Sequence, residues 1–411
     1  MTAARKRKQL LERLFFCGCE HDILMTCSGE YDKAAGQEDA RMWRESRTDG
    51  RKYSGRMYPA EKERNMNQNM NAMKKSEAEK RAAEFIYRCA RPLELARWQY
   101  HFEDGTREAV LCSLAAYQNG DGGFGHALEA DCFNPASAPI QTLTAVGILQ
   151  EIGVTARMAE SGTAGEIVGG ILRYLESGAD FSEEHGQWRN TVPGNNNFPH
   201  AVWWEYKPGE EQFEYNPTAG LTAFLLNFAE PDSELYRRSC RLAVQAISWF
   251  LSKGMFEEQH VTSYFGQLYK SLRVRRDACP EGGQNGKQPG RESSAAEPAQ
   301  EQLDALFPEF ERLFFAQVRK NICADTNQWG GYVAMPSIFI ESEENPLYGE
   351  FRGLLEKECE FILALQQPDG AFPVPWEWFT DYREFEIAKL WWRSVILLDK
   401  MLVLKKFCKD A

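Results

Sequence analysis

The chain has 411 residues, of which 43 % are hydrophobic and 26 % are charged. This composition is ordinary for a soluble globular protein and excludes a fibrous or low-complexity one. The formal net charge of −12 argues against a nucleic-acid-binding protein, because such proteins need positive charge to displace counterions from phosphate.

Membrane and secretion signals are the next features to consider. No apolar run approaches the roughly 20 residues that cross a bilayer, so we expect no integral membrane segment. The apolar stretch Leu14–Cys17 is too short for the core of a signal peptide. We therefore expect a cytoplasmic protein whose 11 cysteines are reduced.

Two segments have a composition that disfavours a packed structure. Residues 1–75 are poor in aliphatic side chains, so we expect them to be mostly disordered, with a helix at Ala4–Phe16. Alternatively, the given first residue lies upstream of the true translational start, which would then be Met25, Met66, Met70 or Met73. Residues 279–300 are rich in Gly, Pro and Ser and predict a flexible insertion.

Between these segments apolar residues recur at helical spacing, and no stretch alternates as a strand would. Asn-Pro pairs at Asn216 and Asn345 predict two helix starts, since Asn caps a helix and Pro suits its first turn. The fold class is therefore all-α, with one domain over 76–411. The expected helices are Glu79–Ala90, Thr106–Tyr117, Ile140–Ile152, Gly165–Leu175, a helix after Asn216, Ser233–Ser252, His260–Val274, Leu303–Ile322, a helix from Asn345 to Leu365, and Glu384–Phe407.

An internal repeat is the most informative pattern. The element Gln-x-x-Asp-Gly-small-Phe occurs twice, each time after an apolar helix, and predicts a tight turn with a glycine of positive φ. The repeated positions are structural: Gln118, Asp121, Gly122, Gly123 and Phe124 in the first copy, and Gln366, Asp369, Gly370 and Phe372 in the second. Gln328-Trp329 and Gln187-Trp188 are expected to be degenerate copies.

These elements resemble the repeats of the prenyltransferase and squalene-cyclase superfamily, over about residues 76–411. The resemblance implies an α/α toroid, a ring of paired inner and outer helices, with the repeats following inner helices. It also implies a single-toroid, prenyltransferase-like protein, because a complete squalene cyclase has two toroids. The fold does not identify the reaction.

The chain departs from the catalytic motifs of both branches of that superfamily. A zinc site is not expected, because Cys323-Ala324-Asp325 has no histidine after it and the last of the six histidines is His260. The Asp-x-Asp-Asp acid motif of cyclases is absent. We therefore predict no metal and no cofactor.

The segment after the first repeat holds the candidate acids. His126, Glu129 and Asp131 lie within six residues, and a helical turn would place His126 and Glu129 on one face. A buried carboxylic acid here, its pKa raised by desolvation, would suit proton transfer. The alternative is a purely structural hydrogen bond between His126 and Glu129.

Two aromatic segments are the candidate substrate-binding walls. One contains His200, Trp203 and Trp204, and the other contains Trp376 and Trp378 around a fourth candidate acid, Glu377; Tyr332 is a further candidate contact. Aromatic faces stabilise cations and stack on sugars. The alternative interpretation is a hydrophobic plug.

Topology predicts that the acids and aromatics meet. If both repeats follow inner helices, the residues after Phe124 and Phe372 emerge at one end of the toroid. Glu129 and Glu377 would then flank one cavity. We therefore hypothesise a terpenoid-cyclase-like or prenyltransferase-like protein acting on an apolar, isoprenoid small molecule. The alternatives are a carbohydrate-active lyase or hydrolase and a non-catalytic helical scaffold.

Overall fold

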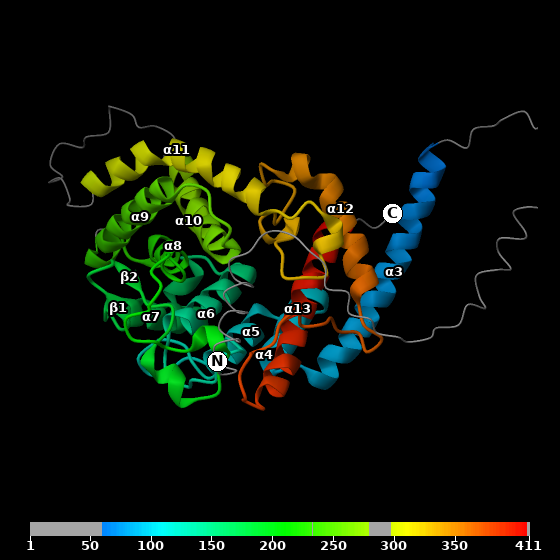
Figure 1. Ribbon diagram of the computed structural model, residues 1–411, viewed down its shortest axis with the longest axis horizontal. Coiled ribbons are helices and arrows are strands. Elements are labelled where there is room, and N and C mark those ends of the chain that lie inside the picture. Colours follow the sequence, from blue (N-terminus) through cyan, green and yellow to red (C-terminus); the bar gives the residue numbers. More distant parts are fainter. Residues whose placement is uncertain (1–59, 232, 279–296, 409–411) are drawn as a thin grey trace, which may run out of the picture. The chain divides into compact units, whose positions relative to one another are not determined.

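A computed structural model describes residues 60–231, 233–278 and 297–408, which belong to one compact unit, Ala60–Ala411. The described part is mostly helical and the all-α class is confirmed (Figure 1). Its one sheet is a hairpin of β1 (Phe181–Ser182) and β2 (Gln187–Trp188). The α-helices are α3 (Ala60–Cys89), α4 (Pro92–Phe102), α5 (Arg107–Ala115), α6 (Pro139–Glu151), α7 (Gly162–Glu176), α8 (Thr218–Phe228), α9 (Glu234–Lys253), α10 (Gln259–Ala278), α11 (Glu297–Asn321), α12 (Tyr348–Leu365) and α13 (Phe385–Phe407).

The polar segments predicted from composition fall largely outside the described residues. This holds for the Ala4–Phe16 helix, for the alternative start Met25 and for residues 279–296 of the predicted insertion. Where the described residues overlap these predictions, the chain is helical. Helix α3 begins at Ala60 rather than near Glu79, and α11 begins at Glu297.

Helix α4 was not predicted, and its buried charges explain why. Glu94 is 1 % exposed and Arg97 is 5 % exposed, so two of its core-facing positions are ionisable. A search for apolar periodicity counts such positions as solvent-facing. The helix begins at Pro92, as expected for proline in a first turn.

Caps define several helix starts. The hydroxyl of Thr106 accepts a hydrogen bond from the Ala109 amide at the start of α5, and Ser233 does the same for Tyr236 at the start of α9. The predicted cap at Asn216 is wrong: α8 begins at Thr218, and the Asn216 Oδ1 atom has no hydrogen-bond partner among the described residues.

The two repeat turns have the same internal geometry. The Gln118 amide donates to the Gly122 carbonyl (2.9 Å), and the Gln366 amide donates to the Gly370 carbonyl (2.9 Å). The Asp121 carboxylate accepts the amide N–H of Gly123. Asp369 does the same for Ala371, and the closing Phe124 and Phe372 are fully buried. The repeat is therefore a structural turn, as predicted.

Each repeat turn also docks on a helix in the same way. Gln118 reaches the Ile167 carbonyl on α7 (3.0 Å), and Gln366 reaches the Ala78 carbonyl on α3 (2.8 Å). The central glycine approaches the carbonyl three residues further along the helix. A Cβ atom on Gly122 would lie 2.0 Å from the Gly170 oxygen, and one on Gly370 would lie 2.0 Å from the Arg81 oxygen. Helix α3 thus makes the same docking contacts with the second turn as α7 makes with the first.

The other two predicted copies do not form this turn. Gln328 lies in a 3-10 turn and donates to the Asp325 carboxylate, and no left-handed glycine follows it. Gln187 lies in β2. Its side-chain amide donates to the Phe213 carbonyl and accepts a hydrogen bond from the Tyr215 backbone N–H. Without the Asp-Gly pair the glutamine side chain has no turn to close, so the prediction of copies at Gln187 and Gln328 is wrong.

Burial separates two kinds of helix. Nine of the thirteen residues of α6 are buried, and α8 buries Thr218 through Leu226 without interruption. By contrast, α5 buries three of nine residues and α12 buries four of eighteen. The repeat turns therefore follow the more exposed helices α5 and α12.

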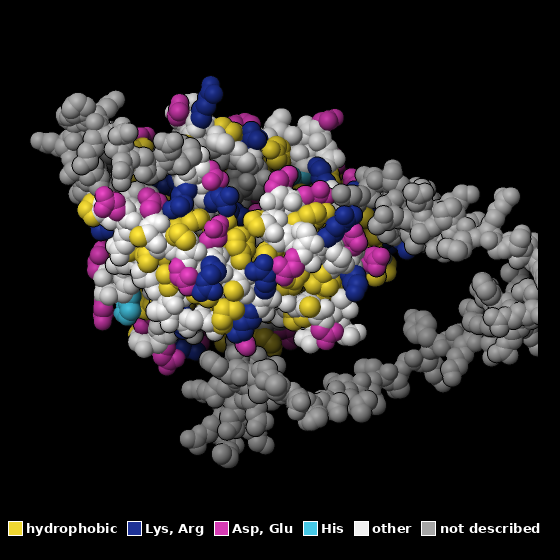
Figure 2. Space-filling model, turned by 90° about the horizontal axis from the view of Figure 1, so that it is seen from above, with side chains coloured by type: hydrophobic (Ala, Val, Ile, Leu, Met, Phe, Trp, Pro, Cys, Tyr) yellow, Lys and Arg dark blue, Asp and Glu magenta, His cyan; other side chains and the backbone are white. Residues whose placement is uncertain are grey.

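The surface carries mixed charge. Figure 2 shows a face on which basic and acidic side chains are interspersed among hydrophobic ones, without a large area of one sign. Within the described residues, no helix is long and apolar enough to cross a membrane.

Candidate functional site

Three loop segments that are distant in the sequence meet in space at the segment that follows the first repeat turn. The Ala201 amide donates to the Asp131 carbonyl (2.9 Å), and Cys132 and His200 form an antiparallel bridge. The Val202 amide donates to the Trp378 carbonyl (3.1 Å). The segments around residues 131, 200 and 378 therefore form one backbone-linked cluster, although they are up to 247 positions apart.

Asp131 lies at the centre of this cluster and is 2 % exposed. Its two oxygens accept from the indoles of Trp378 (2.5 Å) and Trp376 (3.1 Å). Trp392 lies near the same carboxylate without a completed hydrogen bond. Burial raises the pKa of Asp131 to about 6, although all three indoles favour the ionised form. The ionised form of Asp131 is thus stabilised by neutral donors.

Glu129 is the second buried acid and is 8 % exposed. Its carboxyl accepts the Asp131 amide N–H (3.0 Å). Burial raises the pKa of Glu129 well above its ordinary value, and the Asp131 carboxylate raises it further. That amide N–H, the Trp204 indole and the Arg91 guanidinium oppose this shift only in part. The environment of Glu129 therefore favours the protonated form of its carboxyl.

The other two candidate acids do not join this pair. His126 is exposed, has a φ of 60°, and contacts Asn119 of the repeat turn (2.9 Å). The segment is not a helical turn, so the predicted shared face of His126 and Glu129 is wrong. Glu377 is also exposed. Neighbours along an extended chain project to opposite sides, so burial of Trp376 and Trp378 leaves Glu377 outside.

The aromatic candidates differ in burial, and none of them is among the residues that line the cavity beside Glu129. Trp204 is 9 % exposed and packs with Trp378 in a small apolar cluster, with Trp203 half-buried beside them. His200 is buried, and its Nδ1 atom contacts the Phe198 carbonyl (2.6 Å). Tyr332 is 58 % exposed, and its ring lies 6.3 Å from that of Trp376 at nearly a right angle.

A cavity of about 190 Å³ opens beside Glu129. Aliphatic and aromatic side chains form much of its wall, together with one helix face of α6. Its charged residues other than Glu129 are matched in ion pairs. The residues that line it are Arg91, Glu94, Arg97, Leu128, Glu129, Ala130, Thr144, Gly147, Ile148, Glu151, Trp392 and Val395.

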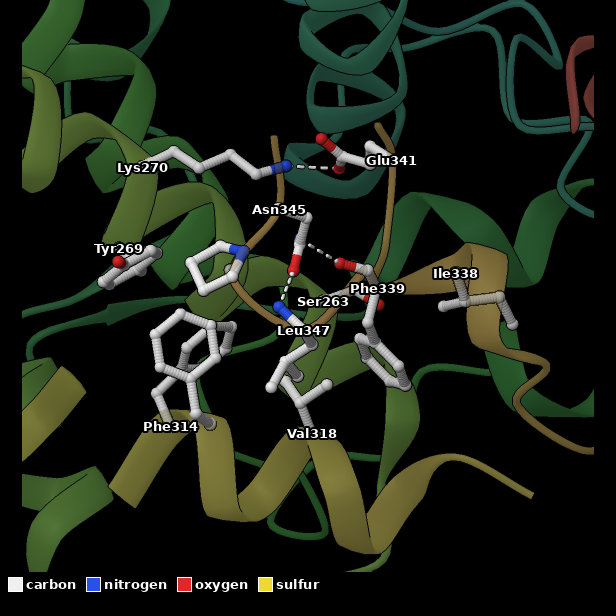
Figure 3. Close-up of a pocket in the computed structure, with 13 residues that line it drawn as sticks. Ser263, Tyr269, Lys270, Phe314, Val318, Ile338, Phe339, Glu341, Asn345 and Leu347 are labelled. Carbon is white, nitrogen blue, oxygen red and sulfur yellow. Dashed lines mark hydrogen bonds and ion pairs between the residues drawn. The ribbon is translucent and has the colours of Figure 1, made fainter. Parts of the chain in front are cut away.

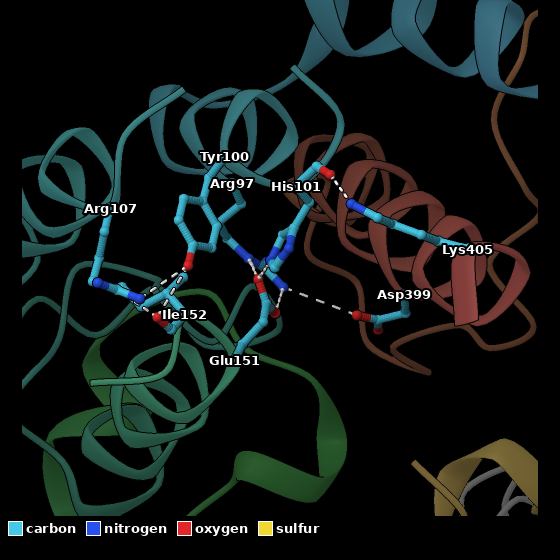
Figure 4. A network of polar contacts seen from close by, with 8 residues as sticks. All are labelled: Arg97, Tyr100, His101, Arg107, Glu151, Ile152, Asp399 and Lys405. Atoms are coloured by element: carbon cyan, nitrogen blue, oxygen red, sulfur yellow. Dashed lines mark hydrogen bonds and ion pairs between the residues drawn. The ribbon is translucent and has the colours of Figure 1, made fainter. Parts of the chain in front are cut away.

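The ion pairs in the cavity wall each form two short hydrogen bonds. Arg97 makes two hydrogen bonds to Glu151 (3.0 and 2.5 Å), and His101 contacts the same carboxylate at 2.9 Å (Figure 4). Although burial opposes ionisation, Arg97 and His101 hold the pKa of Glu151 at about 2. Arg91 makes two hydrogen bonds to Glu94 (2.8 and 2.7 Å). Among the described residues, Glu129 has no cation within ion-pair distance, which distinguishes it from Glu94 and Glu151.

Sequence reasoning missed several residues of this site. Arg91 and Glu94 lie at the start of the unpredicted helix α4, and Tyr264 lies on α10, where burial and the Glu129 carboxyl raise its pKa. A signal was present for the first two: an arginine and a glutamate three positions apart in an apolar segment indicate a buried ion pair. No comparable signal marks Tyr264.

A smaller cavity lies between α10, α11 and the segment before α12 (Figure 3). Its volume is about 40 Å³, enough for a few water molecules at most. Its polar groups already have partners: Lys270 pairs with Glu341, and the Asn345 side-chain amide makes two hydrogen bonds, to Phe339 and Leu347. The larger cavity at Glu129 is therefore the better candidate site.

Neither a search for metal ligands nor comparison with known proteins identifies a function. Within the part of the chain that the structure describes, no group of three or more His, Cys, Asp or Glu side chains is placed to hold a metal ion. No protein-family model, curated protein or solved structure matches this chain.

Proposed function

We propose that this chain is a prenyltransferase-like or terpenoid-cyclase-like α/α toroid enzyme that uses Glu129 as an acid on an isoprenoid substrate. Three observations support the toroid. The two repeat turns share their contacts, the exposed helix α5 is followed by the enclosed helix α6, and α3 receives the last turn as α7 receives the first. A ring is the arrangement in which the first helix can complete the last repeat.

The observation that most supports this chemistry is that Glu129 and Asp131, two neighbouring acids, have different surroundings. Glu129 borders the cavity and burial raises its pKa well above the ordinary value, whereas indole N–H groups hold Asp131 and limit the rise of its pKa to about 6. Environments that separate the pKa values of two neighbouring carboxyls assign one as the acid and one as the charge stabiliser. Glu129 takes the first role and Asp131 the second.

The proposed step balances without a cofactor. The O–H bond of Glu129 breaks as a C–H bond forms at a substrate double bond, which supplies the electron pair. The substrate becomes a cation and Glu129 a carboxylate. The face of Trp392, which lines the cavity, stabilises the positive charge by about 0.5–2 kcal/mol, and the Asp131 carboxyl group next to Glu129 adds to this stabilisation.

The size of the cavity limits what it holds. Its volume of about 190 Å³ is below the roughly 300–1,000 Å³ of most small-molecule sites. We expect it to enclose the reacting end of a longer substrate. The remainder would extend past the exposed ring of Tyr332.

Deuterium transfer tests the proposed reaction. The chain is incubated with geranylgeraniol in D2O, and the products are analysed by mass spectrometry. Protonation of a double bond predicts a product that carries one solvent deuterium, and Glu129→Gln should abolish it while the protein stays folded. Cleavage of maltohexaose in parallel would support the carbohydrate alternative. Neither binding nor conversion of either probe would support the scaffold.

A cavity-filling variant tests the location. Gly147 lies on the cavity wall, and a Cβ atom there meets nothing within 4 Å. Gly147→Leu should abolish geranylgeraniol binding without loss of stability, because it replaces a mid-helix glycine. The matched control is Gly353→Leu on the exposed face of α12, which also has open space. Equal binding by both variants would place the ligand elsewhere.

A further inference from the structure

The loop that presents Glu129 contains two consecutive residues in an unfavourable conformation. His126 has a φ of 60° and Ala127 a φ of 57°. Residues with a Cβ atom lose about 1–2 kcal/mol each in this left-handed region. Glu129 follows two positions later, so external contacts must hold the loop in place.

Arg91 supplies the contact at the strained position. Its Nη1 atom donates to the Ala127 carbonyl (2.7 Å), while its other donors engage Glu94. The guanidinium also lies over the rings of Trp391 (5.1 Å) and Tyr117 (5.6 Å). Arg91 is 8 % exposed, so this arrangement is enclosed on all sides.

The rest of the loop has two further anchors. The His126 amide donates to the Asn134 carbonyl (3.1 Å), and the Leu128 amide donates to the Gln141 side chain (2.9 Å). Gln141 in turn donates to that same Asn134 carbonyl. The Ala127 carbonyl between these anchors depends on Arg91.

We infer that Arg91 is a positioning residue, which fixes the left-handed turn at His126 and Ala127 and so holds the Glu129 carboxyl in the cavity. This inference rests on the proposed function for its meaning, but its geometry is independent of the substrate. Only a planar fork can bond Glu94 through two atoms and Ala127 through a third, so lysine cannot replace it. The charged and titratable groups that face Glu129 are Asp131 on its own loop, Arg91 before α4, Tyr264 on α10 and Tyr332 in the segment after α11.

A matched pair of double variants tests the inference in the full chain. Arg91→Met with Glu94→Leu removes the positioning pair without leaving a buried charge, and such replacements are often tolerated. The control is Arg97→Met with Glu151→Leu, which removes the other buried pair of the same wall but no contact to the Glu129 loop.

Amide hydrogen exchange of residues 125–131 is the first readout. We expect at least a tenfold loss of protection in the Arg91 pair variant and no change in the control. The second readout is the infrared carboxylic-acid band that Glu129→Gln removes. Removing the Arg91 charge would by itself raise the Glu129 pKa, but release of the loop should expose the carboxyl to water, so its titration midpoint should fall toward an ordinary glutamate value of about 4.3 in the Arg91 variant only.

The outcomes separate the two proposals. Unchanged exchange in the Arg91 variant, or equal changes in both variants, would overturn the positioning role. An ordinary midpoint for Glu129 in the unmodified chain would overturn the proposed acid, while the exchange data would still decide on Arg91. If the double variant does not fold, Arg91→Lys is measured instead; it should weaken protection of the loop while retaining an ion pair with Glu94, and wild-type protection would contradict the inference.

Discussion

At the scale of single residues, two acids in one enclosed cluster have raised pKa values, and the surroundings of Glu129 favour its protonated form more strongly. Glu129 has an amide N–H and a nearby indole, neither of which offsets its burial. Burial raises the pKa of Asp131 as well, to about 6, and its two indole hydrogen bonds limit that rise. The difference arises from the number of donors, and both side chains can be tested separately.

The raised pKa of Glu129 predicts a pH-dependent stability. The folded state retains a proton that the unfolded chain releases above about pH 4.5, so this group destabilises the fold increasingly as pH rises toward its folded pKa. Glu129→Gln removes the effect. Its Tm should match the wild type near pH 4 and exceed it by a few degrees at pH 8, as followed by circular dichroism. A constant difference at all pH values would mean that Glu129 is not buried as an acid.

Asp131→Asn should destabilise the fold at pH 7.5. An amide has one acceptor oxygen where the carboxylate has two, so one of the two tryptophan N–H groups loses its partner. A buried donor without a partner costs about 1–3 kcal/mol. Urea denaturation measures this cost, with the exposed Glu377→Gln as a neutral control. A loss equal to that of the control would show that the indoles do not depend on Asp131.

At the scale of elements, the repeat turns show what sequence reasoning could predict. Gln118, Asp121 and Gly122 act within a few residues of one another, so their roles are visible in the local pattern. Arg91 and Asp131 act through contacts with distant segments, which no local pattern reveals. Helix α4 was missed for a related reason, since its buried Glu94 and Arg97 imitate a solvent-facing pattern.

The glycine of the first turn provides a sensitive test of the repeat. Gly122 has a φ of 94°, and an added Cβ atom would lie 2.0 Å from the Gly170 oxygen. Gly122→Ala combines left-handed strain of about 1–2 kcal/mol with overpacking of about 1–3 kcal/mol. We expect a loss of at least about 2 kcal/mol in denaturant unfolding. Gly120→Ala, in the same turn but with open space, should change stability little.

The link between α4 and α6 predicts the opposite dependence on pH. The pKa of Glu151 is held at about 2, so its ion pair with Arg97 stabilises the fold above about pH 4.5 and is lost as pH falls toward 2. Glu151→Gln leaves the buried Arg97 with only its longer contact to Asp399 (3.9 Å) and should cost up to about 3–5 kcal/mol at pH 7. The deficit should shrink on acidification. A deficit independent of pH would point to packing instead of charge.

At the scale of the whole molecule, the described unit joins its first and last helices. Gln366 at the end of α12 reaches α3, and the Lys75 ammonium donates to the Cys408 carbonyl beyond α13 (3.0 Å). The all-α class and the convergence of the segments after both repeats were predictable from sequence. The Asp131–Trp378 hydrogen bond shows this convergence, whereas Glu377 is exposed and does not line the cavity that Glu129 borders.

The protonation state of Glu129 at neutral pH is the most direct test of the whole proposal, because it needs no substrate. Infrared difference spectra between the wild type and Glu129→Gln isolate the carboxyl band of this residue across the pH range. The proposal predicts a carboxylic-acid band at pH 7 that disappears only at higher pH. A carboxylate band already present at pH 5 would contradict it, since an ionised Glu129 has no proton to donate.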